Sequence, residues 1–149
     1  MRDKRFVAVH RGGPLSRDAH HQLINWAHSC VSHVLALFPG GIDERLKDAL
    51  NIAEAWGNGQ ASVGDARNAS LQAIAVANAS SDPVSIAIAR AVGHTVATAH
   101  MADHSLRAVE YALKAIKAAD KSIEKERNWQ DDHMPSEVSA LLLSARSKS

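Results

Sequence analysis

Histidines are the residues in this chain whose number and spacing could support chemistry. The chain has nine of them in 149 residues, and His100 and His104 stand four positions apart. On one helix this spacing brings two imidazoles to the same side, where they can share a metal ion. A third ligand could come from His94, from Asp103 or from a histidine of another segment. A zinc or nickel site is therefore one hypothesis for this stretch.

A structural role is the stronger hypothesis for the same residues. The chain has no HExxH motif and no second pair of ligands at a metal-binding spacing. Neutral imidazoles between helices are usually satisfied by a carboxylate, a carbonyl or another imidazole. We therefore expect a largely buried, hydrogen-bonded polar cluster that stabilises the fold without a cofactor, made of His94, His100, Asp103 and His104. His20, His21 and His133 are predicted to be surface residues.

Other candidates for catalysis are weaker. Cys30 lies on an apolar stripe, where a thiol is usually an inert small hydrophobic group. The Gly12-Gly13-Pro14 turn lacks the Lys-Ser/Thr of a phosphate-binding loop. The sequence therefore predicts no catalytic residue. Because Cys30 is the single cysteine, an internal disulfide is excluded and a reducing compartment is expected.

The histidines fall within the stretch 82–120, which the rest of the chain is expected to surround. Asp82 and Pro83 are typical of a helix start. The Asp82 side chain can cap the first turn, and Pro83 has no backbone N–H that would lack an acceptor there. Apolar residues recur on two faces of the helical wheel, and Gly93 with Ala97 would allow another helix to approach closely. The spacing leaves open whether the stretch is one helix or two with a break near 101–105.

Capping residues and apolar spacing predict further helices on both sides of this stretch. The expected helices cover 17–38 after Ser16, 44–56 after Asp43, 63–78 with a Ser62–Asp65 capping box, an exposed helical continuation over 121–133, and 135–146 opened by Pro135. Aromatic residues are only 4% of a chain rich in alanine. We therefore predict that residues 1–149 form a single all-α domain, a bundle of about five or six helices around a central helix near 82–120.

Two exposed features are candidates for partner binding. Residues 1–16 are expected to be an extended arm, and its cations are Arg2, Lys4, Arg5 and Arg11. Trp129 stands among charged residues, as aromatic anchors of interfaces often do. The alternative is structural: Phe6 and Val7 plug one end of the core, and Trp129 covers the core.

Overall charge and hydropathy narrow the class of partner. Seventeen basic residues against sixteen acidic ones give a net charge of +1, so charge favours neither nucleic acid nor membrane as a partner. The sequence contains no run long and apolar enough to cross a bilayer and no signal-peptide core. We expect a cytoplasmic protein.

Several segments resemble a known family. They are MRDKRFVAVHRGGPL, DERLKDAL, SVGDAR and ARAVGHTVATAHMADHSLRAVEYALKA, and the most specific part is a Gly-His-x5-His-x2-Asp-His core formed by Gly93, His94, His100, Asp103 and His104. Across nearly the whole chain the sequence resembles the all-helical immunity proteins of bacterial polymorphic-toxin systems, in particular the family numbered five. The resemblance implies a protein that neutralises a cognate toxin protein by binding it, without catalysis.

Two alternative functions stay open beside this resemblance. Helical bundles with a His-x3-His pair are similar to metal-dependent hydrolases or transferases of the DinB type, in which an open metal position activates water or thiol. Here His100 and His104 would be the ligands, and the third ligand is not evident. A helical bundle that binds a partner other than a toxin is the second alternative.

Overall fold

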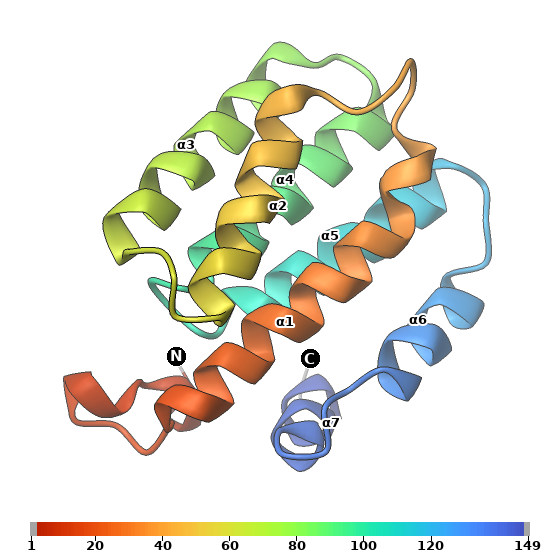
Figure 1. The fold of residues 1–149 in the computed structure, drawn as a ribbon. Helices are drawn as coiled ribbons and strands as arrows, with labels where there is room; N and C mark the ends of the chain where they lie inside the picture. The colour runs from red at the N-terminus through yellow and green to blue at the C-terminus, as the bar shows by residue number, and fades with distance from the viewer. Residues whose placement is uncertain (1–2, 148–149) are drawn as a thin grey trace.

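Seven α-helices make up most of the computed structural model, which describes residues 3–147 (Figure 1). They are α1 (Arg17–Val34), α2 (Glu44–Gly57), α3 (Val63–Ala79), α4 (Pro83–Ala97), α5 (His104–Ala118), α6 (Ile123–Asp132) and α7 (Ser139–Ser147). Three short 3-10 segments and an isolated β-bridge between Ala8 and Leu15 complete the secondary structure of these residues. The predicted all-α class is confirmed. None of the helices within 3–147 is long and apolar enough to cross a membrane.

Local capping explains why these helices begin where they do. The Ser16 hydroxyl accepts a hydrogen bond from the Ala19 amide at 3.0 Å, and Asp82 accepts one from the Ser85 amide at 2.9 Å. Ser62 and Asp65 form the expected reciprocal capping box. Each of these bonds satisfies an amide that the first helical turn leaves without a partner. The predicted starts of α1, α3 and α4 are confirmed.

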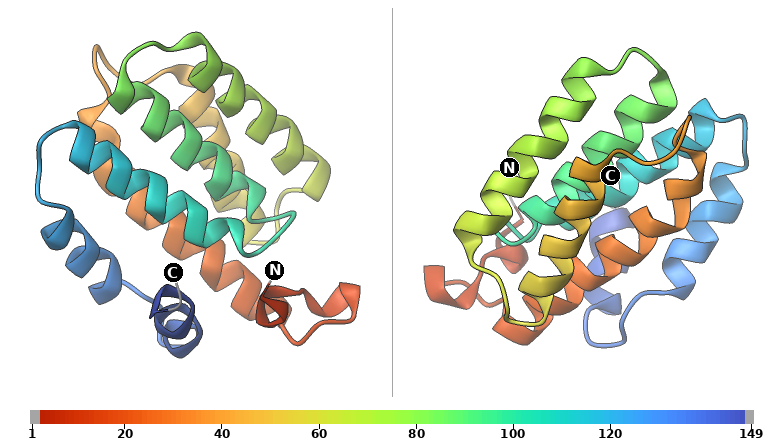
Figure 2. Two further views of the ribbon diagram at one scale, coloured as in Figure 1. Left: turned by 180° about the vertical axis from the view of Figure 1, so that it is seen from behind. Right: turned by 45° about the horizontal axis from the view of Figure 1, so that its top comes forward.

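The stretch 82–120 is two helices and not one. Residues 98–103 turn the chain, so α5 runs back along α4, as the rear view in Figure 2 shows. Helix α4 packs against α1, α2, α3 and α5, and most of its residues are buried. This helix pair, rather than one long helix, forms the centre of the bundle.

Small residues let α3 pack closely on α4. A Cβ atom added to Gly93 would lie 3.6 Å from the Cβ of Ala73, which is an ordinary contact distance. Ala66, Ala73 and Ala77 are all buried on the inner side of α3. The expected close approach of a helix at Gly93 is therefore present, with space left for one methyl group.

The C-terminal third differs from the sequence-based prediction. Helix α5 ends before Asp120, whose φ of 58° is left-handed, so residues 121–133 do not continue that helix. Ser122 then caps a separate α6. Pro135 lies in a turn, and α7 begins at Ser139. Together with the break at 98–103, the break at Asp120 explains why residues 3–147 form more helices than the expected five or six.

A buried polar network attaches α6 and α7 to the bundle. The Trp26 indole donates to the Gln130 backbone carbonyl at 2.9 Å, and the Gln130 side chain donates to the Val109 carbonyl at 3.2 Å. Arg146 donates to the Gln130 side-chain oxygen and, at 2.5 Å, to Asp131. Gln130 is fully buried, although it lies within a strongly charged stretch. The expectation that this stretch is exposed is wrong for Gln130 and for Glu126, which are both buried.

The N-terminal segment is folded back instead of extended. Two 3-10 turns cover Lys4–Phe6 and Val9–Arg11, and the Val9 amide bonds to the Leu15 carbonyl at 2.8 Å. Phe6 has no exposed surface and joins the core cluster that contains Trp26 and Leu142. The expectation of an extended arm is therefore wrong. Phe6 instead packs into one end of the core, which was the alternative considered for it.

Candidate functional site

His94 and His104 form a close pair across the α4–α5 turn. Their Nδ1 atoms are 2.8 Å apart, and their ring centroids are 5.0 Å apart with the planes 24° from parallel. A hydrogen bond at this distance requires one Nδ1 to carry the hydrogen and the other to accept it. The two rings therefore hold each other in complementary tautomers, one donating and the other accepting.

The surroundings of His94 keep it neutral. Partial burial, and after it the neighbouring His104, Arg107 and Arg90, lower the pKa of His94 from 6.5 to about 4. Each of these causes disfavours the charged imidazolium. At neutral pH His94 is an uncharged hydrogen-bonding group.

A glutamine in place of His94 is expected to weaken the acid sensitivity of the fold. As pH falls below 6.5, the unfolded chain protonates this histidine while the folded protein resists protonation until about pH 4. The free energy of unfolding should therefore fall through that window, by on the order of 1–3 kcal/mol from this residue. Urea unfolding at pH 7 and pH 4.5 measures the effect, and His94→Gln should lose less stability on acidification than the wild type. An equal loss in both proteins would contradict the assignment.

His100 and Asp103 belong to the turn between α4 and α5. His100 Nδ1 is 3.4 Å from an Arg67 Nη atom of α3, and Asp103 stands at the start of α5 without a side-chain capping bond. The expectation of a largely buried cluster is wrong, because all four of its residues are partly exposed. They are His94, His100, Asp103 and His104. The four residues thus lie at the junction of α4 and α5, each of them partly accessible to solvent.

The break between α4 and α5 also removes the geometry on which the metal-site hypothesis for His100 and His104 depends. His100 and His104 were expected to share one helical face, but His100 belongs to the turn and His104 is the first residue of α5. Over residues 3–147, no three side chains of His, Cys, Asp or Glu come together in an arrangement that could hold a metal ion.

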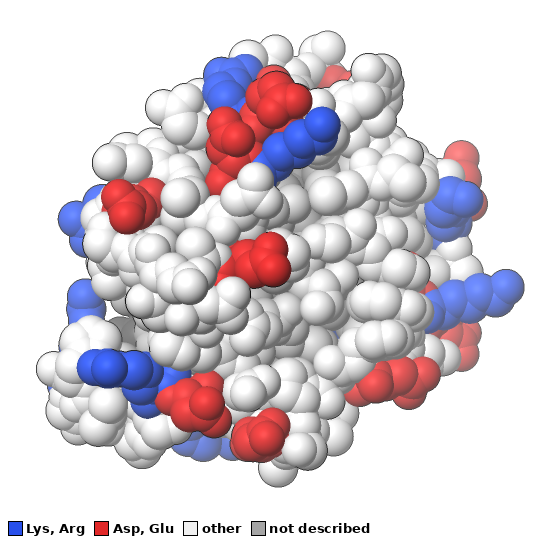
Figure 3. Space-filling view, viewed as in Figure 1, with Lys and Arg blue, Asp and Glu red and all other residues white. Residues whose placement is uncertain are grey.

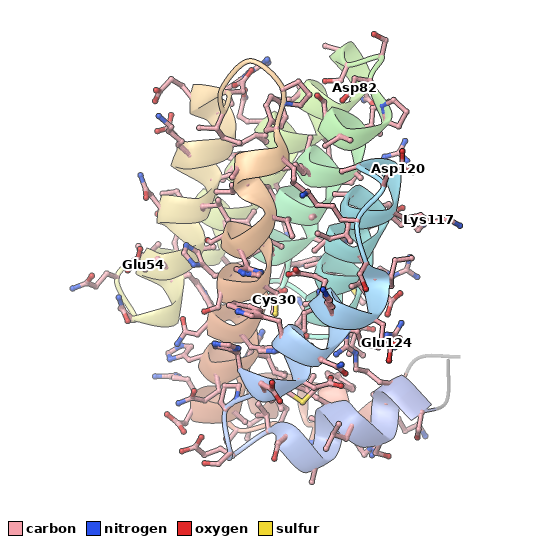
Figure 4. The ribbon with its side chains drawn as sticks, turned by 90° about the vertical axis from the view of Figure 1, so that its right-hand side faces the viewer. Cys30, Glu54, Asp82, Lys117, Asp120 and Glu124 are labelled. Carbon is pink, nitrogen blue, oxygen red and sulfur yellow. The ribbon has the colours of Figure 1, made fainter. Side chains whose placement is uncertain are left out.

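Two further side chains that could take part in a reaction are buried. His20 is 3% exposed and lies 2.5 Å from the Thr98 carbonyl, so its predicted surface position is wrong. Cys30 is fully buried on α1, facing α6 in Figure 4. Burial raises the pKa of the Cys30 thiol, which keeps it protonated and unreactive.

The N-terminal cations differ in their surroundings. Arg5 is paired with Asp3 at 2.7 Å and donates to the Ser144 hydroxyl of α7 at 2.9 Å. Lys4 and Arg11 are exposed. Arg2 lies outside the described residues. Unlike Arg5, Lys4 and Arg11 therefore point into solvent and form no ion pair with another described residue.

Trp129 is stacked between two histidine rings. Its ring centroid is 3.8 Å from that of His33 and 3.8 Å from that of His133, with nearly parallel planes. His33 is also 2.6 Å from the Glu126 carboxylate. Because imidazoles cover both faces of the indole, a partner could reach only its partly exposed edge.

Comparison with known proteins identifies the family. The family model described as "Imm-5 like putative immunity protein" matches residues 13–137. The chain belongs to this family. No curated protein and no solved structure matches it. As an Imm-5 like protein it has an immunity role, and its matched region runs from the Gly12-Gly13 turn to the loop before α7.

Proposed function

We propose that this Imm-5 like protein neutralises a cognate toxin protein by binding it, without catalysis. The observation that carries the proposal is the family match over residues 13–137. We place the protein in the cytoplasm, where a lone cysteine such as Cys30 stays reduced.

The geometry of the reactive side chains supports inhibition by binding. A general base works best when its pKa is near the working pH, whereas the pKa of His94 is about 4. The Nδ1 atoms of His94 and His104 are directed at each other, and Cys30 is inaccessible. Lys4, Arg11 and the exposed edge of Trp129 remain candidate contacts for the toxin, together with Arg2.

Stoichiometry distinguishes binding from catalysis. The probe is the toxin domain encoded beside the gene for this protein, purified and mixed with increasing amounts of the immunity protein. We expect toxin activity to fall in proportion to the immunity protein and to vanish at stoichiometric amounts, with a stable complex on size exclusion. Complete protection at strongly substoichiometric amounts would contradict binding and favour an enzyme. Folded protein that neither binds nor protects would contradict the toxin-binding function.

A variant with Lys4→Glu and Arg11→Glu tests the N-terminal segment in the same titration. Lys47→Glu on α2 is a control, since Lys47 is also an exposed cation. A weaker complex for the double variant alone would support contact through this segment.

A further inference from the structure

The outer faces of α4 and α5 together present a surface centred on Tyr111. Arg107, Tyr111 and Lys114 recur at spacings of four and three, so they share one side of α5. Arg90 lies on the neighbouring α4, and its guanidinium carbon is 6.0 Å from the Tyr111 ring centroid. We call Arg90, Arg107, Tyr111 and Lys114 the Tyr111 surface. Helices α4 and α5, which carry these residues, lie side by side at the front of the rear view in Figure 2.

This surface is hollowed on both sides of the tyrosine. A hollow of about 340 Å³ lies between α4 and α5, and one of about 310 Å³ lies between α5 and α7. Tyr111 and Lys114 line both of them. Protruding side chains of a partner would therefore fit on either side of Tyr111.

The charge of the Tyr111 surface is predominantly positive. Arg90, Arg107 and Lys114 are exposed, and within residues 3–147 no salt bridge involves any of them. Glu110 is the one carboxylate among the residues that line the two hollows. Lys117, one turn beyond Lys114, points away from the bundle in Figure 4 and extends the basic stripe along α5.

The opposite face has a different charge pattern. On α2, Arg45 is paired with Asp43 at 3.2 Å and Lys47 with Glu44 at 3.5 Å. Figure 3 shows acidic and basic side chains mixed along the upper part of that face and few charges at its centre. The cations of α2 are thus paired with carboxylates, whereas Arg90, Arg107 and Lys114 of the Tyr111 surface are in no salt bridge among residues 3–147.

Tyr111 is held in place for contact. His94 stacks on its ring at 5.3 Å with planes 9° apart, and the Lys114 ammonium lies 4.4 Å from the ring centroid. Its side chain is partly exposed, and no described residue hydrogen-bonds its hydroxyl. A fixed aromatic ring with a free hydroxyl, surrounded by cations, has the composition of an interface hot spot.

We propose that the Tyr111 surface binds the toxin and that the toxin presents an acidic segment to it. This inference rests on the proposed toxin-binding function. Carboxylates of the segment would pair with Arg90, Arg107 and Lys114, and a side chain beside them would pack on Tyr111. Opposite charges would also accelerate association, an effect that salt screens.

The test compares affinities for the same toxin domain. The variant Arg90→Glu/Lys114→Glu reverses two exposed charges of the surface, and Arg45→Glu/Lys47→Glu makes the same net change on α2. We expect the first variant to bind about 10- to 100-fold more weakly at low salt, with a slower association rate, and the control to bind within about threefold of the wild type. Raising the salt concentration should slow association of the wild type more than that of the Arg90/Lys114 variant.

Each outcome identifies which proposal fails. Equal affinities for the wild type and both double variants would overturn the Tyr111 surface and leave toxin binding intact. Equal weakening of both double variants would also overturn it, because net charge alone would then explain the loss. A wild type that does not bind the toxin domain would overturn the function and this inference with it. Binding of duplex DNA that Arg90→Glu/Lys114→Glu abolishes, with toxin affinity unchanged, would assign the surface to nucleic acid instead.

Discussion

Trp26→Ala is expected to lower the free energy of unfolding by about 3–5 kcal/mol. Trp26 is 1% exposed in the core cluster that also contains Phe6 and Leu142. The substitution removes the largest side chain of that cluster and leaves the Gln130 carbonyl without its indole donor. It also removes the ring beneath the Arg146 guanidinium, 5.5 Å away. Urea denaturation followed by circular dichroism measures the change.

Trp26→Phe separates the packing contribution from the hydrogen bond. Phenylalanine keeps most of the aromatic volume but has no N–H, so the expected loss is about 1–3 kcal/mol. If Trp26→Ala cost no more than Trp26→Phe, the cluster would not depend on the bulk of this side chain, and the packing described above would be incorrect.

Arg146→Met is expected to destabilise the protein by about 2–4 kcal/mol. The Arg146 side chain is 7% exposed and donates to Gln130 and Asp131, so its removal leaves a buried amide oxygen and a half-buried carboxylate without their donor. Asp131 retains some contact with water at 35% exposure, which limits the loss. Methionine preserves much of the volume, so the change reports chiefly on the polar contacts.

The loss should be concentrated at the C-terminal helices. Hydrogen exchange of α7 amides should accelerate in Arg146→Met well before that of α4, because Arg146 links α7 to α6. Arg107→Met, at an exposed position on α5, is the matched control and should change stability by less than about 0.5 kcal/mol. Uniform acceleration across all helices would argue against a local anchoring role.

The helix starts could be predicted because their causes are local. Ser16, Ser62 and Asp82 bond to amides three residues away, so the sequence itself contains both partners. The turn between α4 and α5 has no such signal. Residues 98–103 include neither glycine nor proline, and Asp103 does not cap α5 with its side chain. The contacts made by this turn come from distant parts of the chain, such as the His20 ring of α1 on the Thr98 carbonyl.

The positions of the candidate-site residues were harder to predict than the helix starts, because they depend on contacts between distant parts of the chain. His20 lies three and four positions before the buried Leu23 and Ile24, a spacing that could have indicated burial on the same face. The burial of Gln130 had no comparable signal, since its partners are Trp26, Val109 and Arg146 on three other helices. The Tyr111 surface likewise appears only when α5 folds back along α4 and brings Arg90 beside Tyr111.

The contact between Arg5 and Ser144 has a consequence for the kinetics of folding. It joins residues 139 positions apart, whereas α2, α3, α4 and α5 pack in succession on their neighbours along the chain. Closing a long loop costs more entropy than closing a short one, so contacts between sequence neighbours form more readily at first. The central helices should therefore assemble early, and the N-terminal segment should meet α7 late. The contact between the N-terminal segment and α7 should also be the first to separate when the protein unfolds. Proteases should therefore begin to cut in these two segments.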